Sequence, residues 1–245
     1  MPIEPRTDDI YHEARPAIGD FKFDRSVATV FDDMVTRSVP YYLEIQRMLV
    51  ELVRDFAQPD SSVYDLGCST GTTLTNLDPR LDPRIRFVGI DNSAEMLEKC
   101  RAKFRERGTD RPLELQCRDL NEGVVVEDAT VAMLVLTLQF LRPLRRDRLI
   151  ADIYRGLRPQ GCLLLVEKVL GEDSLFNRLF IKYYYDMKRR NGYSESEISQ
   201  KREALENVLI PYKLLENREL LLTTGFRYVD VFFKWYNFCG LVAVK

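Results

Sequence analysis

From residue 62 onward, the sequence alternates short apolar runs with helical patterns. The helical patterns cover residues 93–107 and 144–157, and the apolar runs cover residues 63–66, 86–90, 113–117, 129–136 and 162–169. Apolar runs of this length are typical of strands that are buried on both faces of a sheet. Strands that alternate with helices pair in parallel through crossover connections. The sequence therefore predicts an α/β fold, with a doubly wound, mostly parallel sheet covered by helices on both faces.

The remaining segments divide the chain into a core and its additions. Further helical patterns cover residues 26–34, 41–56, 174–190, 194–209 and 217–224, and strand-like runs cover 228–235 and 238–244. Pro40 precedes the second pattern, as a first-turn proline would. We predict an N-terminal tail and helices packed on the core over residues 1–60, an α/β domain over 61–245, and a helical insertion at 171–211. The insertion would be a lid or a dimer contact, and the last two runs would form an antiparallel edge pair.

Composition excludes several classes of protein. With 36 basic and 38 acidic residues the net charge is −2, so no global field draws the chain to nucleic acid or to an acidic membrane. No apolar run approaches the roughly 20 residues needed to cross a bilayer, and the polar start is no secretory signal, so we expect a cytoplasmic protein. The five cysteines show no metal-ligand spacing, and His12 is the single histidine. A histidine-based triad or zinc site is therefore not expected.

A glycine-containing turn follows the first predicted strand. Residues 65–71 read DLGCSTG, and Asp91 and Asn92 end the second strand. Glycine lets the backbone approach a ligand closely, and an acidic residue about 20 positions later can accept both hydroxyls of a ribose. Ser69 replaces the middle glycine of a dinucleotide loop, and no lysine follows Gly71, which disfavours a phosphate-binding loop. The pattern favours a nucleoside attached to an amino acid; the alternative is an ordinary turn beside a surface aspartate.

The same residues resemble motif I of the class I S-adenosylmethionine-dependent methyltransferases. The resemblance covers residues 61–168 and implies a Rossmann-like sheet of seven strands with a reversed last hairpin, and no metal. It implies that Asp91 binds the ribose, that Asn92 flanks the adenosine, and that Asp119 and Leu120 hold the adenine. The methionine part would lie against Gly67, Cys68 and Ser69, with Cys68 contributing its backbone rather than a nucleophile.

A narrower resemblance spans nearly the whole chain. The segments that carry it are residues 31–34, 37–42, 137–141, 191–195, 198–202, 205–208, 237–238 and 241–243. They resemble the carboxy-S-adenosyl-L-methionine synthase family. That resemblance implies conversion of S-adenosylmethionine and prephenate into carboxy-S-adenosyl-L-methionine and phenylpyruvate. A partner tRNA carboxymethyltransferase would then use the product to modify wobble uridine, and we expect a homodimer formed through the insertion.

Arg202 is the residue that separates this activity from methyl transfer. Ser194 and Glu197 form a capping box, and the helix that follows places Arg202 on one face with Ile198, Leu205 and Leu209. A guanidinium on a buried face needs an anionic partner. That partner could be a carboxylate such as Glu206. The family resemblance instead implies that Arg202 binds the added carboxylate of the product.

The resemblance also implies how the reaction proceeds. Tyr42 would reach the sulfonium end of the cofactor; the alternative is a core aromatic residue. Prephenate would supply carbon dioxide by decarboxylation and expel hydroxide as the base, so the protein would need positioning and electrostatics rather than a tuned general base. The alternatives are a conventional methyltransferase acting on a small molecule or an RNA base, and a non-catalytic scaffold for the partner enzyme.

Two departures and one basic cluster qualify these expectations. Val135 stands where the family usually has asparagine, and residues 183–185 (YYY) stand where histidines are common. Either change could alter cofactor affinity or the acceptor. The cluster of Lys188, Arg189, Arg190, Lys201 and Arg202 is more typical of solvated helix faces than of an RNA site, so we expect no direct nucleic acid binding.

Overall fold

A single seven-stranded sheet organises the computed structural model, which describes residues 7–13 and 17–245. In the order β3-β2-β1-β4-β5-β7-β6, the strands are β3 (Leu113–Cys117), β2 (Arg86–Asp91), β1 (Ser62–Leu66), β4 (Ala129–Val135), β5 (Leu157–Lys168), β7 (Phe238–Val244) and β6 (Tyr228–Trp235). Neighbouring strands from β3 to β5 pair in parallel, whereas β7 is antiparallel to both β5 and β6. The predicted doubly wound α/β class is confirmed.

The directions of β6 and β7 correct the prediction of a reversed last hairpin. The expected reversed hairpin contains a single reversed strand, because β7 runs against both of its neighbours. A tight turn always reverses the chain, so one member of a hairpin must follow the direction of the parallel strands. Strand β6 follows that direction at the outer edge, and β7 returns to lie between β5 and β6.

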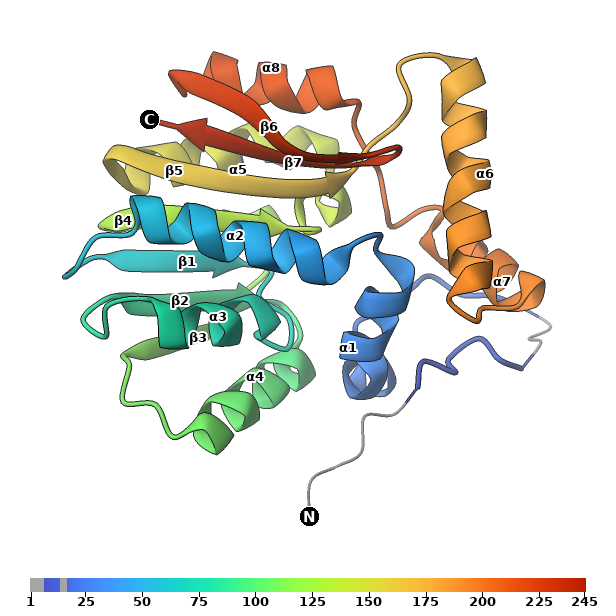
Figure 1. Cartoon of the computed structure of the whole chain (residues 1–245), viewed down its shortest axis with the longest axis horizontal. Helices are drawn as coiled ribbons and strands as arrows, with labels where there is room; N and C mark the ends of the chain where they lie inside the picture. Colours follow the sequence, from blue (N-terminus) through green and yellow to red (C-terminus); the bar gives the residue numbers. More distant parts are fainter. Residues whose placement is uncertain (1–6, 14–16) are drawn as a thin grey trace.

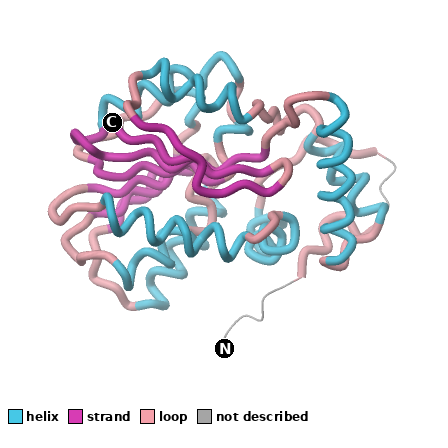
Figure 2. Tube along the Cα trace, turned by 45° about the horizontal axis from the view of Figure 1, so that its top comes forward, coloured by secondary structure: helices cyan, strands magenta, loops and turns pink. Residues whose placement is uncertain are grey.

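Helices cover both faces of the sheet (Figures 1 and 2). The α-helices are α1 (Arg25–Ser38), α2 (Tyr42–Phe56), α3 (Thr72–Leu77), α4 (Ala94–Arg107), α5 (Pro143–Gly156), α6 (Ser174–Arg190), α7 (Glu195–Leu205) and α8 (Leu214–Thr224). Short 3-10 helices lie at η1 (Asp78–Arg80), η2 (Leu120–Glu122) and η3 (Leu138–Phe140). Side chains of α5 and α8 pack in one core cluster and those of α2, α3 and α4 in the other. Alternate residues of the strands point into the two clusters, as buried parallel strands require.

Helix ends follow local side-chain chemistry. Asp24 and Ser93 cap α1 and α4 by accepting backbone N–H bonds, and the capping box of Ser194 with Glu197 is present at the start of α7. Helix α7 ends at Leu205, four residues before the predicted end. Pro40 lies before the N-cap of α2 and not in its first turn, since Tyr41 takes the cap position in a left-handed conformation at φ 53°.

The N-terminal segment packs on the domain. The predicted tail includes residues 1–6 and 14–16, which lie outside the described residues. Within residues 7–13, Asp8 and Tyr11 are buried against the rest of the protein. Tyr11 and Phe21 join a third apolar cluster with side chains of α1, α4 and α7. Phe21 N–H donates to Ala204 O at 2.9 Å, which ties the segment to the end of α7.

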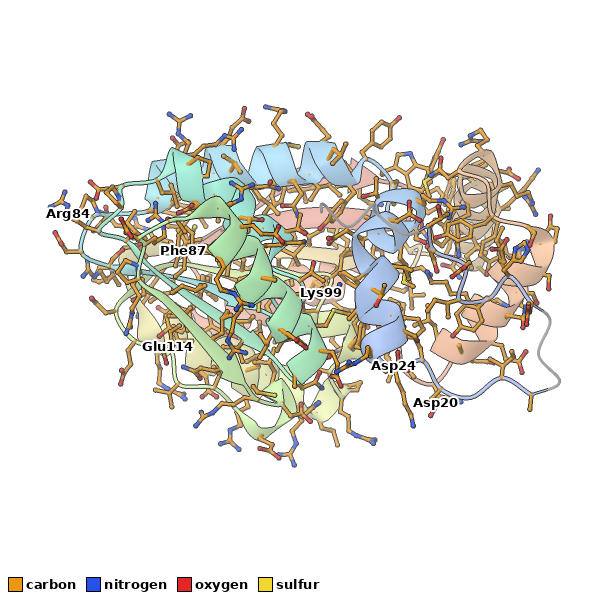
Figure 3. All side chains as sticks on the ribbon, turned by 90° about the horizontal axis from the view of Figure 1, so that it is seen from below. Asp20, Asp24, Arg84, Phe87, Lys99 and Glu114 are labelled. Atoms are coloured by element: carbon orange, nitrogen blue, oxygen red, sulfur yellow. The ribbon has the colours of Figure 1, made fainter. Side chains whose placement is uncertain are left out.

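The additions gather at one end of the sheet. Figure 1 shows α1, α6 and α7 beyond the carboxyl ends of the parallel strands. In Figure 3, Asp20 and Asp24 lie toward this end, and Arg84 and Glu114 lie at the opposite end. Among the residues described, no helix is both long and apolar enough to cross a bilayer. Helix α1 and the insertion thus stand over the edge where open α/β sheets bind ligands, whereas α2 packs on a face of the sheet.

Candidate active site

A cavity of about 440 Å³ lies between the carboxyl edge of the sheet and helices α1, α6 and α7. Its position beside β1 and β4 is the point where the strand order reverses, which is where doubly wound sheets bind their ligands. All the predicted site residues line this one cavity: Tyr42, Gly67, Cys68, Ser69, Asp91, Asn92, Asp119, Leu120 and Arg202. The fold therefore brings together residues that are up to 160 positions apart in the chain.

The glycine loop is held in one conformation by contacts on both sides. Gly67 adopts φ +85°, and a Cβ there would collide with the Thr137 side chain. Ser69, at φ 51°, donates its backbone N–H to Asp91 Oδ2 at 2.9 Å. Asp91 Oδ1 accepts Ser93 N–H at 2.9 Å. Burial raises the pKa of Asp91, and these backbone hydrogen bonds oppose that rise.

Helix α1 is attached to the same loop. Asp32 accepts a hydrogen bond from Thr70 Oγ1 at 2.6 Å and pairs with Lys103 Nζ of α4 at 2.7 Å. The pKa of Asp32 is lowered, since Lys103 and the threonine hydroxyls outweigh the opposing effect of burial. Asp32 thus joins the N-terminal helix, the loop and α4 at the cavity wall.

Asp65 is a cavity residue that the sequence interpretation did not single out. It is 1% exposed, and its Oδ1 has no hydrogen-bond partner among the residues that the structure describes. Burial, with a smaller contribution from the charge of Asp91, raises the pKa of Asp65 to about 7. An unpartnered buried carboxylate on a cavity wall suits a cationic group of a ligand. In the sequence, Asp65 could have been recognised as an acidic residue within the apolar run that forms β1.

Cys68 and Tyr42 occupy the inner wall. Cys68 is 4% exposed, and its hydrogen bond with Cys100 together with burial raises its pKa well above the ordinary thiol value. Such a thiol is a poor nucleophile, which agrees with a backbone role for Cys68. Tyr42 is buried in the core cluster and lines the cavity as well. The two interpretations of Tyr42, a core aromatic and a cofactor contact, are therefore compatible.

Arg202 corrects the prediction of a buried guanidinium. It is exposed, and no ion pair of Arg202 occurs within the described part of the chain, including with Glu206. Ile198, Leu205 and Leu209 line the cavity beside it. The apolar stripe borders the cavity, while Leu205 also packs against the third apolar cluster, and the exposed guanidinium lies beside the stripe instead of beneath it. It lines the cavity of its own chain.

The buried basic residue of α7 is Lys201, which precedes Arg202. Lys201 is 6% exposed and pairs with Asp8 Oδ2 at 3.4 Å. Asp8 also accepts the Tyr193 hydroxyl at 2.5 Å. Burial lowers the pKa of Lys201 despite the nearby carboxylate.

Two further lysines line the cavity. Lys168 ends β5, and Lys188 lies near the end of α6 with 4% of its surface exposed. Burial lowers the pKa of Lys168 to about 8 and that of Lys188 to about 7. The sequence interpretation missed Lys168 and placed Lys188 and Lys201 on a solvated face. The predicted basic cluster of residues 188–190, 201 and 202 therefore does not share one surface. Lys188 and Lys201 are buried, whereas Arg189 points outward and pairs with Asp186 and Glu195.

The departures from the family pattern also lie at the cavity. Val135, Tyr184 and Tyr185 line it, whereas Tyr183 is exposed and packs against Tyr236 with ring centroids 4.9 Å apart. His12 lies outside the cavity, 77% exposed and 4.0 Å from Glu197. In residues 7–13 and 17–245, no group of three or more His, Cys, Asp or Glu side chains is arranged to hold a metal ion.

Comparison with known proteins agrees with the fold. A family model described as "Methyltransferase domain" matches residues 63–161. An O-methyltransferase family protein from Burkholderia thailandensis superposes with a TM-score of 0.65 at 18% identity, over 91% of this chain and 60% of that one. Human N-acetylserotonin methyltransferase, in complex with SAM, superposes with a TM-score of 0.58 at 16% identity, over 90% of this chain and 55% of that one. The chain has the class I methyltransferase fold.

Sequence similarity narrows the class. Carboxy-S-adenosyl-L-methionine synthase from Methylococcus capsulatus is 62% identical over 239 residues, which is 97% of this chain and 99% of that protein. The enzyme of the same name from Shewanella sediminis is 41% identical over 97% of this chain and 98% of that protein. The chain belongs to the carboxy-S-adenosyl-L-methionine synthase family.

Proposed function

We propose that this protein converts S-adenosylmethionine and prephenate into carboxy-S-adenosyl-L-methionine and phenylpyruvate. The observation that carries the proposal is Arg202, a guanidinium without a carboxylate partner among the described residues, on the wall that also holds the glycine loop. Methyl donation alone leaves such a group without a role. A carboxylate added to the sulfonium ligand would give it an anion to bind in a bidentate manner.

The cavity residues fit S-adenosylmethionine. The left-handed backbone at Gly67 leaves no room for a side chain, Asp91 is oriented by two backbone N–H groups, and Asp65 presents an unpartnered carboxylate oxygen. Asp91 would hold the ribose, and Asp65 would face a cationic part of the ligand. Asp119, whose Oδ1 accepts Asn121 N–H at 2.9 Å, would hold the adenine with Leu120. S-adenosylmethionine would supply the sulfonium methyl group that accepts the carboxyl.

The protein's own contribution would be positioning and charge. Prephenate would provide both the carbon dioxide and the hydroxide base, so no histidine near the reacting atoms is needed, and His12 lies on the surface. Tyr42 would flank the sulfonium, and Arg202 would hold the new carboxylate. Apolar cavity residues such as Val39, Phe140 and Phe238 would exclude water and strengthen these interactions.

Carboxyl-labelled prephenate tests this function. Incubation with S-adenosylmethionine should yield a cofactor product about 44 Da heavier than the substrate, with the label retained, by mass spectrometry. Arg202→Met should lower kcat/KM by about 100-fold, while leaving the melting temperature unchanged because the side chain is exposed. Arg190→Met, at another exposed arginine, is the matched control. Appearance of label from solvent bicarbonate, or formation of a methylated acceptor instead, would contradict the proposal.

The cellular role and assembly follow as parts of the same proposal. The product would pass to a tRNA carboxymethyltransferase in the cytoplasm for wobble uridine modification, without direct tRNA binding by this chain. A homodimer through residues 171–211 is supported by Leu175 and Phe176 of α6, which are 53% and 49% exposed. Light scattering should give twice the chain mass, and a gel shift with tRNA at physiological salt should be absent.

A further inference from the structure

Three lysines line one wall of the cavity and lie against tyrosine rings. Lys168 Nζ lies 5.0 Å from the Tyr184 ring centroid, and Lys188 Nζ lies 5.7 Å from the same ring. Lys188 is also 5.1 Å, and Lys201 5.6 Å, from the Tyr193 ring. Three ammonium groups from β5, α6 and α7 are therefore collected around two tyrosines.

Carboxylates neutralise only part of this charge. Lys201 pairs with Asp8, but neither Lys168 nor Lys188 forms an ion pair with any residue that the structure describes. Lys188 is 4% exposed and lines the cavity, so its ammonium is buried and directed toward the ligand space. Burying an unpaired ammonium is costly, and the ring faces of Tyr184 and Tyr193 compensate for a fraction of the lost hydration. The arrangement leaves two positive charges available to a ligand.

The turn between α6 and α7 holds this wall in place. Tyr193 N–H donates to Lys188 O at 3.1 Å, which brings the Tyr193 ring beside the lysine. Asn191 Nδ2 donates to Arg37 O at 2.8 Å, and Arg37 Nε donates to Asn191 O at 2.9 Å. The insertion is thereby fixed to α1, and the lysines are positioned before any ligand arrives.

We infer that Lys168 and Lys188 form an anion subsite, separate from Arg202, that binds the carboxylates of the second substrate. This inference rests on the proposed function and assigns the residues that recognise the dicarboxylate. Two unpaired ammonium groups match the two negative charges of a dicarboxylate, and the adjoining rings match an apolar carbon skeleton. The acidic wall, with Asp65 and Asp91, repels the same anion and leaves it to the lysines.

The depressed pKa values of the two lysines agree with an open anion site. Burial alone lowers the pKa of Lys168, with no carboxylate opposing it, and burial is the largest cause of the lowered pKa of Lys188. A bound carboxylate would restore the charged form of both groups.

The test compares Lys188→Met and Lys168→Met with Lys182→Met, which removes an exposed lysine of α6 that does not line the cavity. Each cavity variant should raise KM for prephenate by about 30-fold or more, because a buried charge contact is lost. Affinity for S-adenosylmethionine, measured by calorimetry, should change less than about threefold. Lys188→Arg should recover part of the loss, and the melting temperature should not fall because the removed charge is unpaired.

Equilibrium binding of prephenate without S-adenosylmethionine separates this inference from the proposed function. Lysine-dependent binding without carboxylated product would retain the subsite and overturn the function. Turnover with an unchanged KM in both cavity variants would overturn the subsite and retain the function. The subsite would also be overturned if the rise in KM for prephenate were matched by an equal loss of S-adenosylmethionine affinity, or if Lys182→Met raised KM equally.

Discussion

The two walls of the cavity carry opposite charges and are built in different ways. The acidic wall is made by consecutive strand ends, and backbone N–H groups orient Asp91. The basic wall is made by side chains of β5, α6 and α7, and aromatic rings surround its lysines. The comparison teaches that a generic cofactor site can be contained in one local motif. The basic wall instead combines Lys168 of the core strand β5 with side chains of α6 and α7, which are inserted between β5 and α8.

The largest expected effect comes from the acidic wall. Gly67→Ala places a methyl group against Thr137 at a position with φ +85°, so the loop must move. We expect a loss of cofactor affinity of about 100-fold or more and a decrease of about 2–4 kcal/mol in the free energy of unfolding. Calorimetry and urea denaturation measure the two quantities.

Gly108→Ala is the matched control for this change. Gly108 has φ +63°, but nothing lies within 4 Å of a Cβ built there. The left-handed conformation alone should cost about 1–2 kcal/mol and leave cofactor affinity intact. Equal losses of affinity in the two variants would show that the close approach at Gly67 is unimportant for binding.

A smaller effect is expected at Asp65. Asp65→Asn removes the unpartnered carboxylate and should weaken S-adenosylmethionine binding by about 10-fold to 30-fold. Folding raises the pKa of Asp65 from about 4 in the unfolded chain to about 7. Between these values the folded state holds more protons, so stability falls as pH rises through the window. The destabilisation is complete above pH 7.

The free energies of unfolding of the wild type and of Asp65→Asn should therefore diverge as pH rises. Asp65→Asn should be more stable than the wild type at pH 8, by about 1 kcal/mol or more, and the difference should shrink toward pH 4. Denaturation curves at pH 5 and pH 8 measure it. A difference that is constant with pH would mean that Asp65 does not titrate in the folded protein.

The smallest expected effect sharpens the basic wall. Burial lowers the pKa of Lys188 to about 7, with contributions from Lys201 and Lys168 and opposing contributions from Asp8 and Glu197. In the proposed subsite prephenate binds the charged form, so affinity should be nearly constant below about pH 6, fall about twofold by pH 7, and fall about fivefold more between pH 7 and pH 8. Lys188→Arg, which stays charged, should remove most of this fall. An identical pH profile in the variant would assign the titration to another group.

Local patterns predicted most of the framework. The bounds of β3, α6, β6 and β7 agree with the apolar and helical periodicity, and Ser93 and Ser194 cap the helices that their spacing indicated. The glycine loop and Asp91 could be recognised because glycine geometry and an acidic residue at a strand end act over short distances.

Other features depended on how distant segments meet. Helical spacing placed Arg202 on a face with Ile198, but it carried no information on whether that face meets a packed neighbour or a cavity. Asp8 belonged to a predicted tail, yet it is buried against Lys201.

Periodicity and short motifs of this sequence determined the strands, the helices and the glycine loop, because each of these depends on residues that are close together in the chain. Tertiary structure decided that Lys168, Tyr184 and Lys188 share one wall, and that Asp65 Oδ1 has no hydrogen-bond partner among the described residues. The physical reason is that charge and burial depend on every group within a few ångströms. For these residues, those groups come from segments far apart in the chain.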